Sequence, residues 1–501
     1  MSVVLAIDAG TTGVRCMAFT ESGTVAASSY REFPQHFPRP GWVEHDPLEI
    51  WEAVVITLKE TLRELSAPVA AIGITNQRET VVVWDRKDGR PLHRAIVWQD
   101  RRGATTCEDL ARQGHLDTVR SKTGLTLDPY FSATKLAWLF GPGGVEVTPS
   151  TAFGTVDSWL LWHLSGGTAH ATDVTNASRT LLFDIDSLSW DDELCDIFGV
   201  KRSVLPEVVP SSARTATTAA GAVDGLPAGI PISGIGGDQQ SALFGQACFE
   251  EGMTKNTYGT GSFVLMNVGP TRPQAVDGIL TTVAWALGSV SASGVDYALE
   301  GSIFVTGAAI QWLRDGLGLL GDASQAGPVA SSVPDSGGVF FVPAFTGLGS
   351  PWWDPRARAT IIGLSRGSSR AHLVRAAVEA MAYQTADVVE AMAAAAGRAP
   401  KELRVDGGAS VMDLLLDFQA DLLGIDVRRS AVSETTALGA AFLAGLAEGV
   451  WSTQSEIAAV WAASRTASPT TDRARLDETA ARYATWRRAV ERSREWELPD
   501  S

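Results

Sequence analysis

The stretch that decides the fold is Val3-Val4-Leu5-Ala6-Ile7-Asp8-Ala9-Gly10-Thr11-Thr12-Gly13. Its first five residues are apolar and mostly β-branched, so they predict a buried strand. Glycines and threonines follow at once, which predicts a tight turn directly after the strand. Such a turn can present backbone N–H groups to an anion. The opening of the chain therefore predicts a strand followed by a turn able to hold a phosphate.

The same succession of strand and glycine turn recurs along the chain. Three more strand-like runs lead into glycines: 232–235 before Gly237, 254–258 before Gly259, and 403–406 before Gly408. Helical patterns separate these runs, and strands that alternate with helices indicate an α/β fold. No residue-by-residue repeat is visible, but the distribution fits a duplicated pair of α/β domains.

Local signals place several of the remaining elements. Asp46 is predicted to cap a helix that begins at Pro47, where the missing N–H of proline does no harm. Further predicted elements are strands at 69–75, 81–84 and 95–98, and helices at 370–392 and 412–423. The strands at 81–84 and 95–98 are predicted to flank an Asp88-Gly89 turn as a hairpin.

The length of 501 residues exceeds what one hydrophobic core usually supports. The most suitable boundary lies between Gln246 and Gly252. We therefore predict an N-terminal domain at 1–250, a C-terminal domain at 251–450, and an Arg-, Ala- and Glu-rich helical tail at 451–501 that packs on the second domain.

The composition is that of an ordinary globular protein, with 45% hydrophobic and 20% charged residues. The formal net charge of −16 argues against nucleic-acid or anionic-membrane partners, because no basic excess exists to displace counterions. The four cysteines form no C-x-x-C pair, and no apolar run is long enough for a membrane span. The N-terminus also lacks the basic region of a signal peptide. We therefore expect a cytoplasmic protein without an integral membrane segment.

The first turn carries a set of phosphate-binding side chains. The hydroxyls of Thr11 and Thr12 add donors beside the backbone of Gly13, and Arg15 offers a planar fork to phosphate oxygens. Asp8 could hold Mg²⁺ through water. The alternative is a plain hairpin turn with no ligand, because short glycine motifs are weak evidence alone.

A second turn of this kind, Tyr258-Gly259-Thr260-Gly261-Ser262-Phe263, lies in the other half of the chain. Two such turns in two halves predict a clamp over the β- and γ-phosphates of a nucleotide. The chain has neither the G-x-x-x-x-G-K-[ST] loop nor the protein-kinase motifs, which excludes those two nucleotide-binding classes.

Asp238 follows Gly236-Gly237 at the end of a strand-like run. Phosphoryl transfer to a hydroxyl needs a group that accepts the proton of the attacking hydroxyl, and a carboxylate within hydrogen-bond reach can do this. The alternative is that Asp238 caps the following helix, and the two roles are compatible.

These motifs together resemble the glycerol kinase branch of the carbohydrate-kinase family, which shares its fold with actin, hexokinase and the heat-shock ATPases. The resemblance extends from about Leu5 to about Leu446. The segment Asn76-Gln77-Arg78-Glu79-Thr80 is the most specific to that branch. Further matching segments follow in the family's order at 95–102, 127–135, 172–180, 255–261 and 343–349. The resemblance implies two actin-like (ribonuclease H-like) domains with an interdomain cleft. The N-terminal domain would bind the polyol and phosphate, and the C-terminal domain would bind the nucleotide. The resemblance also implies ATP and Mg²⁺ as co-substrate and cofactor, and a homodimer or homotetramer.

The resemblance also implies roles for individual residues. The glycerol-binding residues would be Arg78, Glu79, Trp98, Tyr130, Asp238, Gln239 and Phe263, with Trp98 and Phe263 as apolar walls. The nucleotide-binding residues would be Thr11, Thr12, Gly13, Arg15, Thr260, Gly307, Gln311, Gly408 and Met412. Asp238 would be the catalytic base, and Asp8 and Asp238 would hold the metal. Without the family, a surface ion pair at 78–79 and a core tryptophan at 98 would be the simpler interpretations.

Three positions depart from the family pattern. Ala9 stands where glutamine is usual, Gly13 where serine is frequent, and Met412 where asparagine is common. Gly13 keeps its backbone N–H but has no hydroxyl, and Met412 cannot hydrogen-bond adenine or ribose in the same way. These departures put nucleotide affinity in question.

Two other interpretations remain open from the sequence. The nearest is a kinase of the same family that acts on another polyol or a ketose, such as erythritol or xylulose; the Arg78-Glu79 pair argues against it. The other is a relative without catalysis that senses glycerol or acts as an interaction protein; the retained Asp8, Arg15, Thr260 and Asp238 argue against it. An actin-like filament protein is a more remote alternative, because the polyol-site residues would have no purpose in it.

Overall fold

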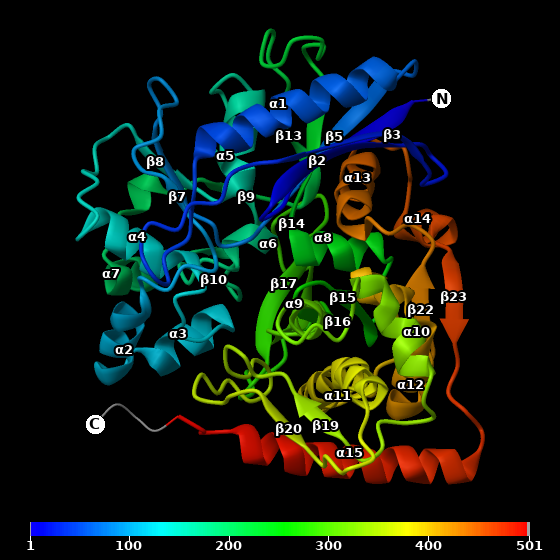
Figure 1. The fold of residues 1–501 in the computed structure, drawn as a ribbon. Coiled ribbons are helices and arrows are strands. Elements are labelled where there is room, and N and C mark those ends of the chain that lie inside the picture. The colour runs from blue at the N-terminus through cyan, green and yellow to red at the C-terminus, as the bar shows by residue number, and fades with distance from the viewer. Residues whose placement is uncertain (1, 498–501) are drawn as a thin grey trace.

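The structure is a computed structural model that describes residues 2–497, and it contains two large sheets (Figure 1). The first sheet has the order β13-β14-β5-β1-β2-β3, with bounds Ser212–Thr217, Pro231–Gly237, Val69–Asn76, Val3–Ala9, Gly13–Phe19 and Val25–Glu32. The second has the order β17-β18-β16-β15-β21-β22-β23, with bounds Leu280–Ala286, Val295–Ile303, Ser262–Gly269, Met253–Tyr258, Glu402–Gly407, Val427–Ser430 and Ala463–Ala467.

The two sheets share one five-strand pattern. Along β3-β2-β1-β5-β14, successive pairs are antiparallel, antiparallel, parallel and parallel. Along β18-β16-β15-β21-β22, the successive pairs have the same directions. The order of strands and turns is thus duplicated although the residues are not. The prediction of an α/β fold with two similar units is confirmed.

Helices and short strands complete both halves. The helices of the first half are α1 (Pro47–Glu64), α2 (Ala104–Arg112), α3 (Leu116–Thr123), α4 (Ser132–Phe140), α5 (Val156–Leu164), α6 (Val174–Ala177), α7 (Asp192–Phe198), η1 (Arg202–Val204) and α8 (Asp238–Gly245). Those that follow are α9 (Gly307–Asp315), η2 (Ala323–Gln325), α10 (Ala326–Ser331), α11 (Arg370–Ala396), η3 (Gly408–Val411), α12 (Asp413–Leu423), α13 (Thr435–Ala447), α14 (Gln454–Val460) and α15 (Arg473–Ser493). The short strands are β4 (Glu44–His45), β6 (Val82–Asp85), β7 (Ala95–Ile96), β8 (Thr151–Gly154), β9 (Ala171–Asp173), β10 (Phe183–Asp184), β11 (Ser189–Trp190), β12 (Glu207–Val209), β19 (Phe340–Val342) and β20 (Thr360–Ile362).

The start of α1 follows the local sequence. The Asp46 side chain accepts a hydrogen bond from the Leu48 N–H, and Pro47 is the first helical residue. This arrangement satisfies one of the N–H groups that a helix start leaves without a partner. The predicted cap is therefore confirmed. Figure 1 shows α1 lying along the outer side of the first sheet.

Helix α13 links the two halves. It comes late in the chain, yet it packs against β5, β14 and α8 of the first half (Figure 1). Glycines allow this approach: a Cβ added to Gly439 would lie 1.8 Å from the Ser241 carbonyl oxygen, and one added to Gly73 would lie 2.1 Å from that of Ala440. Residues 435–447 fall within the predicted second domain by position, but their packing joins them to the first sheet.

The predicted hairpin around Asp88-Gly89 is present. Gly89 has a φ of 72° in the turn, and antiparallel bridges join Val81 to Ile96 and Trp84 to Pro91. The two segments also have partners outside the hairpin, because β6 pairs with β8 and β7 pairs with β4. Segments distant in sequence supply these additional backbone partners, and a local turn signal does not reveal them.

The C-terminal tail covers the second half of the molecule. Helix α15 runs along its outer edge, and Tyr483 and Trp486 each donate a hydrogen bond of 2.8 Å to Asp387 of α11 (Figure 1). The tail is not purely helical as predicted, because β23 pairs antiparallel with β22 and extends the second sheet. No helix within residues 2–497 is both long and apolar enough to cross a membrane.

Candidate active site

The first glycine turn joins β1 to β2 and offers free backbone donors. The Gly10 N–H closes the turn by donating to the Gly13 carbonyl at 3.0 Å. The N–H groups of Thr11 and Thr12 donate to no atom of residues 2–497. Two neighbouring free N–H groups form the kind of concave donor set that binds phosphate oxygens.

Side chains behind this turn hold its carbonyl groups. Gln35 donates to the Thr11 carbonyl at 2.9 Å, and Gln77 donates to the Gly10 carbonyl at 3.0 Å. His45 lies between the two glutamines, 2.7 Å from the Gln35 amide oxygen and 3.3 Å from the Gln77 nitrogen. Because these hydrogen bonds hold the two carbonyl groups, the conformation of the turn is fixed before any ligand binds.

The second turn repeats this design between β15 and β16. The Gly259 N–H donates to the Gly261 carbonyl at 2.8 Å, and the N–H groups of Thr260 and Gly261 have no acceptor in the part of the chain that the structure describes. The start of α9 lies directly against this turn, since the Gly307 N–H donates to the Gly259 carbonyl at 3.0 Å. A Cβ on Gly307 would lie 2.6 Å from that carbonyl oxygen.

Asp238 is the first residue of α8, directly after β14. Its Oδ1 accepts from the Gln239 N–H at 2.7 Å and lies 3.2 Å from Arg78 Nε. No residue from 2 to 497 donates a hydrogen bond to its Oδ2. Burial raises the pKa of Asp238, although the positive charges of Arg78 and Lys255 act to lower it. The side chain is 29% exposed, so the rise is smaller than complete burial would give. Asp238 is thus a carboxylate with one free oxygen and a strengthened affinity for a proton.

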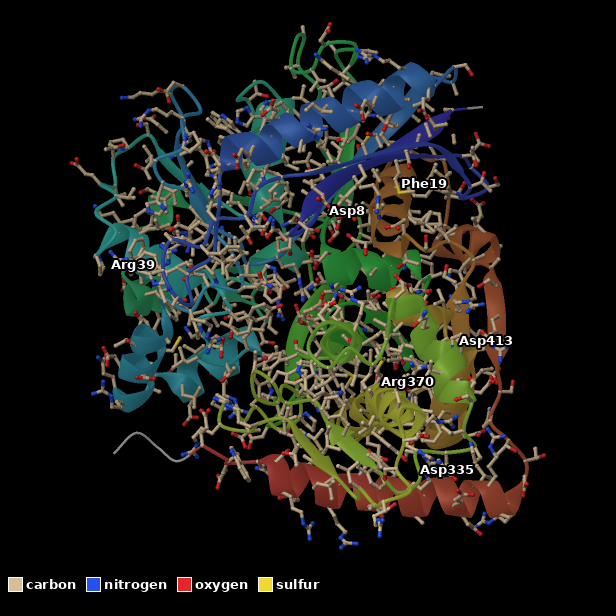
Figure 2. All side chains as sticks on the ribbon, in the orientation of Figure 1. Asp8, Phe19, Arg39, Asp335, Arg370 and Asp413 are labelled. Carbon is tan, nitrogen blue, oxygen red and sulfur yellow. The ribbon has the colours of Figure 1, made fainter. Side chains whose placement is uncertain are left out.

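Asp8 ends up beside Asp238 although the two residues are far apart in sequence. It lies in β1 opposite Arg15 of β2, at the end of the strand that faces the second half (Figure 2). Burial and the neighbouring charge of Asp238 raise the pKa of Asp8 to about 7, against the effect of Arg15. Two carboxylates that disfavour each other's charge are suited to share a cation.

Arg15 is held by a residue of the other half. Its guanidinium forms an ion pair with Glu434, which directly precedes α13, and both side chains are about one-third exposed. The pair joins the strand after the first glycine turn to the start of the helix that links the halves. A phosphate would therefore compete with Glu434 for Arg15.

A buried network of four charges fixes Arg78. Both terminal nitrogens of Arg78 donate to the Glu300 carboxylate, at 2.6 and 2.9 Å. Arg179 donates to Glu79 at 2.7 Å and to Glu300 at 3.1 Å. Two guanidinium groups and two carboxylates balance in charge, as burial requires. Arg78 is therefore a fixed cation inside the protein, and the surface ion pair considered for residues 78–79 is not what the structure contains.

The two carboxylates of this network have different electrostatics. Burial alone would raise the pKa of Glu300, but Arg179 and Arg78 outweigh it and lower the pKa to about 2. Burial raises the pKa of Glu79 above its ordinary value despite the same two arginines. Glu79 Oε1 receives Arg179 and lies 3.8 Å from Arg78 Nε, while its Oε2 accepts no hydrogen bond from residues 2–497.

The backbone of Glu79 is also unusual, with a φ of 61° at a residue other than glycine. Such a conformation is strained and persists only where the surroundings enforce it. Here Ser132 donates to the Glu79 carbonyl at 3.2 Å, and Arg179 holds the side chain. In this conformation the Glu79 carboxylate lies 3.8 Å from Arg78 Nε.

Aromatic side chains line the same place. The ring of Trp98 lies 5.6 Å from that of Tyr130 and 6.4 Å from that of Phe263, edge to face in both cases. The Arg78 guanidinium lies 6.0 Å from the centre of the Phe263 ring, and Trp98 Nε1 donates to Thr11 Oγ1 at 2.9 Å. These aromatic side chains therefore adjoin both the charged cluster and the first glycine turn.

Gln239 is bound to a lysine that the sequence-based set did not include. Lys255 of β15 is fully buried and donates to the Gln239 side-chain oxygen and to Thr257. Burial lowers the pKa of Lys255 to about 8, against the charges of Asp406 and Asp238. Lys255 supplies a positive charge near the free carboxylate of Asp238.

The predicted nucleotide contacts of the second half are brought together only in part. Gly407 pairs with Tyr258 at the end of β15, so Gly408 follows directly beside the second turn. Gln311 is exposed on α9, and Met412 packs next to Gly327 of α10. Within residues 2–497, no hydrogen bond or ion pair joins Gln311 or Met412 to the turn, and their assignment stays a prediction.

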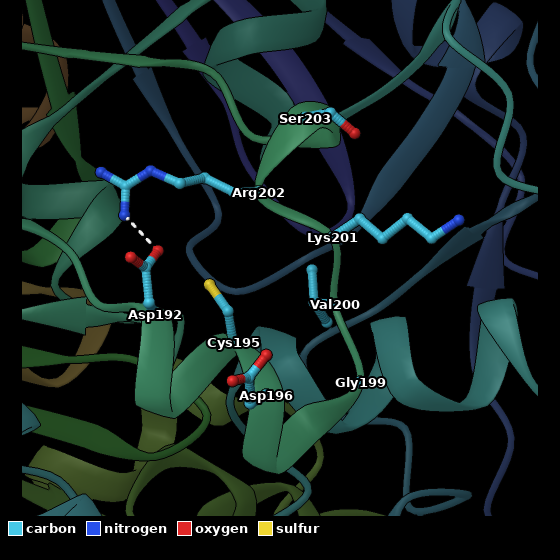
Figure 3. Close-up of a pocket in the computed structure, with 8 residues that line it drawn as sticks. All are labelled: Asp192, Cys195, Asp196, Gly199, Val200, Lys201, Arg202 and Ser203. Carbon is cyan, nitrogen blue, oxygen red and sulfur yellow. Dashed lines mark hydrogen bonds and ion pairs between the residues drawn. The ribbon is translucent and has the colours of Figure 1, made fainter.

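A surface pocket lies away from the predicted site residues. It is formed by the end of α7 and the residues that follow it, including Cys195, Lys201 and Arg202, with Arg202 paired to Asp192 at 2.8 Å (Figure 3). It contains none of the predicted site residues. Among residues 2–497, no three His, Cys, Asp or Glu side chains gather as a ready-made metal site.

Comparison with known proteins identifies the family of the chain. Models of the FGGY family of carbohydrate kinases match the chain, the N-terminal domain over residues 3–245 and the C-terminal domain over 254–448. The chain belongs to the FGGY family of carbohydrate kinases.

The relatives within this family are more specific. A glycerol kinase of Dechloromonas aromatica is 52% identical over 500 residues, which span 98% of both chains. Glycerol kinase 2 of Thermotoga maritima is 50% identical over 99% of this chain and 100% of its own. Among solved structures, a Plasmodium falciparum glycerol kinase with ADP has a TM-score of 0.91 at 35% identity over 98% of both chains.

Proposed function

We propose that the chain is a glycerol kinase, which transfers the γ-phosphoryl group of ATP to a terminal hydroxyl of glycerol and yields sn-glycerol 3-phosphate. The observation that carries the proposal is the pair of carboxylates at Arg78. Asp238 and Glu79 flank Arg78 Nε at 3.2 and 3.8 Å, and each keeps one oxygen free. Free carboxylate oxygens accept hydrogen bonds from polyol hydroxyls and reject analogues that lack them. Relatives named glycerol kinase at about half identity support the choice of polyol.

Glycerol would lie among Arg78, Glu79 and Asp238, with its carbon chain against Trp98 and Phe263. Tyr130 and Gln239 would complete the polar contacts. Asp238 would accept the proton of the attacking hydroxyl through Oδ2, since its Oδ1 is already engaged by Gln239 and Arg78. A raised pKa suits this role, because a base that holds a proton more firmly removes it more readily.

ATP would bind between the two turns. Thr11, Thr12, Gly13 and Arg15 would contact the phosphates from the first half. Thr260 would do so from the second half, and Gly307, Gln311, Gly408 and Met412 would lie toward the adenosine. The free N–H groups at Thr11, Thr12, Thr260 and Gly261 support this arrangement.

Mg²⁺ fits Asp8 and Asp238. Magnesium is commonly held by one or two carboxylates together with phosphate oxygens and water, so a cluster of three acidic ligands is not needed. Burial and the negative charge of Asp238 raise the pKa of Asp8, and a cation shared by the two carboxylates would offset that repulsion. When bound, the metal supplies charge neutralisation to the phosphates.

Closure of the two halves around both substrates would exclude water and limit ATP hydrolysis. We also propose that the protein works in the cytoplasm as a homodimer or homotetramer. The four cysteines are buried and free, which suits a reducing compartment. Analytical ultracentrifugation of the purified chain would test the oligomeric state.

The test is a coupled ADP-release assay with Mg-ATP and five acceptor conditions: glycerol, erythritol, xylulose, dihydroxyacetone and none. We expect turnover with glycerol, and a loss of about 10²–10⁴-fold in kcat for Asp238→Asn. Asp224→Asn is the matched control, because that carboxylate is 92% exposed and its ion-pair partner is Lys59 of α1. Asp8→Asn should raise the Mg²⁺ concentration needed for half-maximal activity.

Other outcomes would redirect the proposal. Preference for erythritol or xylulose would keep the phosphoryl transfer but overturn the glycerol site. Measurable glycerol binding by calorimetry without turnover on any acceptor would identify a sensor instead. Unchanged activity in Asp238→Asn would remove Asp238 as the base.

A further inference from the structure

Tyr30 of β3 lies beside the first phosphate-binding turn, and no family motif includes it. It pairs with Arg15 of β2 across the sheet. Its hydroxyl oxygen is 3.5 Å from Thr12 Oγ1, and the Arg15 guanidinium lies 5.1 Å from the centre of its ring. The residue is 45% exposed, so burial of the ring does not account for its position.

Gly13 makes room for this tyrosine. A Cβ added to Gly13 would lie 2.7 Å from the Tyr30 hydroxyl oxygen and 2.6 Å from the Arg31 carbonyl oxygen. Gly13 is not at a positive φ, so its backbone conformation does not itself require glycine. The absence of a side chain at residue 13 instead lets β3 approach and lets Tyr30 occupy the space above the turn.

We propose that Tyr30 is a further phosphate-binding residue, whose hydroxyl donates a hydrogen bond to the phosphate chain of the nucleotide. This inference rests on the proposed function. Thr12 and Arg15 are the two side chains of the turn best suited to hold phosphate, and Tyr30 contacts both. A phosphate held between them is within reach of the Tyr30 hydroxyl. Tyr30 thereby supplies a side-chain hydroxyl at a turn where residue 13 has none.

A purely structural role is the competing explanation. The Tyr30 ring could hold Arg15 in place by a cation–π contact alone. Phenylalanine keeps the ring and that contact but removes the hydroxyl, whereas leucine removes both. The variants Tyr30→Phe and Tyr30→Leu therefore separate a hydrogen-bonding role from a stacking role.

The matched control is Ser28→Ala. Ser28 lies two residues from Tyr30 on the same face of β3 and is exposed, and its hydroxyl bonds to no residue from 2 to 497. Removing it deletes a hydroxyl from the same strand without touching the turn. Thermal unfolding of all three variants would establish that each one folds.

The experiment measures KM for Mg-ATP and for glycerol, together with binding of ATP, ADP and adenosine by calorimetry. A hydrogen bond to a charged group predicts roughly a tenfold rise in the KM for Mg-ATP in Tyr30→Phe. The KM for glycerol and the affinity for adenosine should stay unchanged. Tyr30→Leu should be affected at least as strongly, and Ser28→Ala not at all.

Two failures remain distinguishable. Wild-type affinity for ATP in Tyr30→Phe, with a loss confined to Tyr30→Leu, would overturn the hydroxyl's role and leave only the stacking contact. A wild-type protein that binds ATP but phosphorylates no glycerol would contradict the proposed function instead. In that case, the calorimetric comparison of ATP with adenosine would still test Tyr30.

Discussion

Replacing Glu300 by glutamine should damage both stability and glycerol binding. Glu300 is fully buried in β18 and receives three charged hydrogen bonds, two from Arg78 and one from Arg179. Glutamine has nearly the same size, so the change removes a charge and leaves the packing intact. Two buried guanidinium groups would then face a single buried carboxylate, that of Glu79.

The expected loss in the free energy of unfolding follows from the geometry. Removing one partner of a buried ion pair typically costs about 3–5 kcal/mol, because the other charge stays buried without compensation. Arg78 keeps Asp238 at 3.2 Å, and the amide oxygen of the introduced glutamine could still accept a hydrogen bond from one arginine. The lower end, about 3 kcal/mol, is therefore the expected value.

Urea unfolding with linear extrapolation would measure this loss. The control is Glu251→Gln, because Glu251 and its partner Arg398 are both more than 40% exposed and should contribute at most about 1 kcal/mol. Arg78 would also lose its anchor, so the KM for glycerol should rise while the KM for ATP stays unchanged. A Glu300→Gln protein within about 1 kcal/mol of the wild type would refute the argument that this network is charge-balanced and rigid.

Three further predictions concern other parts of the molecule. Gly439→Ala places a methyl group against the Ser241 carbonyl and should lower the melting temperature by several degrees, measured by calorimetry. Burial raises the pKa of Asp387 to about 6. The contribution of Asp387 to the free energy of unfolding is therefore complete below about pH 4 and is lost as the pH rises through 6. In urea titrations over that window, the stability of Asp387→Asn should depend less on pH than that of the wild type. Lys255→Met removes a charge that lowers the pKa of Asp238, so the acid limb of the pH profile of kcat/KM should move to higher pH.

Much of the fold could be predicted because its signals are local. The strand at 69–75, the cap at Asp46 and the long helix from Arg370 all rest on burial pattern and turn chemistry within a few residues. The pairing of β6 with β8 and the packing of α13 on the first sheet could not be predicted this way. These contacts join segments about 70 or more residues apart, and neither segment carries a local sequence signal that identifies its partner.

The candidate site shows the same division. Arg78, Glu79 and Asp238 stand in recognisable motifs, and the structure brings them together at Arg78 Nε. Glu300 stands in no motif, and its role appears only when β18 is placed next to β16. Arg179 lies inside a matching segment, but the segment does not reveal that the arginine holds Glu79. A buried Glu in a predicted strand is a signal that an unusual partner must exist, since such a charge is not buried alone.

The position of Glu300 also shows that both halves of the molecule contribute residues to the predicted polyol site. The polyol site was predicted to belong to the N-terminal domain, and Arg78, Asp238 and Trp98 do lie there. Yet Glu300 of the second sheet fixes Arg78, and Phe263 of the same sheet faces Trp98. A displacement between the halves would therefore pull on the guanidinium that positions Glu79 and Asp238. The buried ion pairs of Glu300 with Arg78 and Arg179 therefore link acceptor binding to the relative position of the halves, so a closed arrangement and a competent acceptor site should form together.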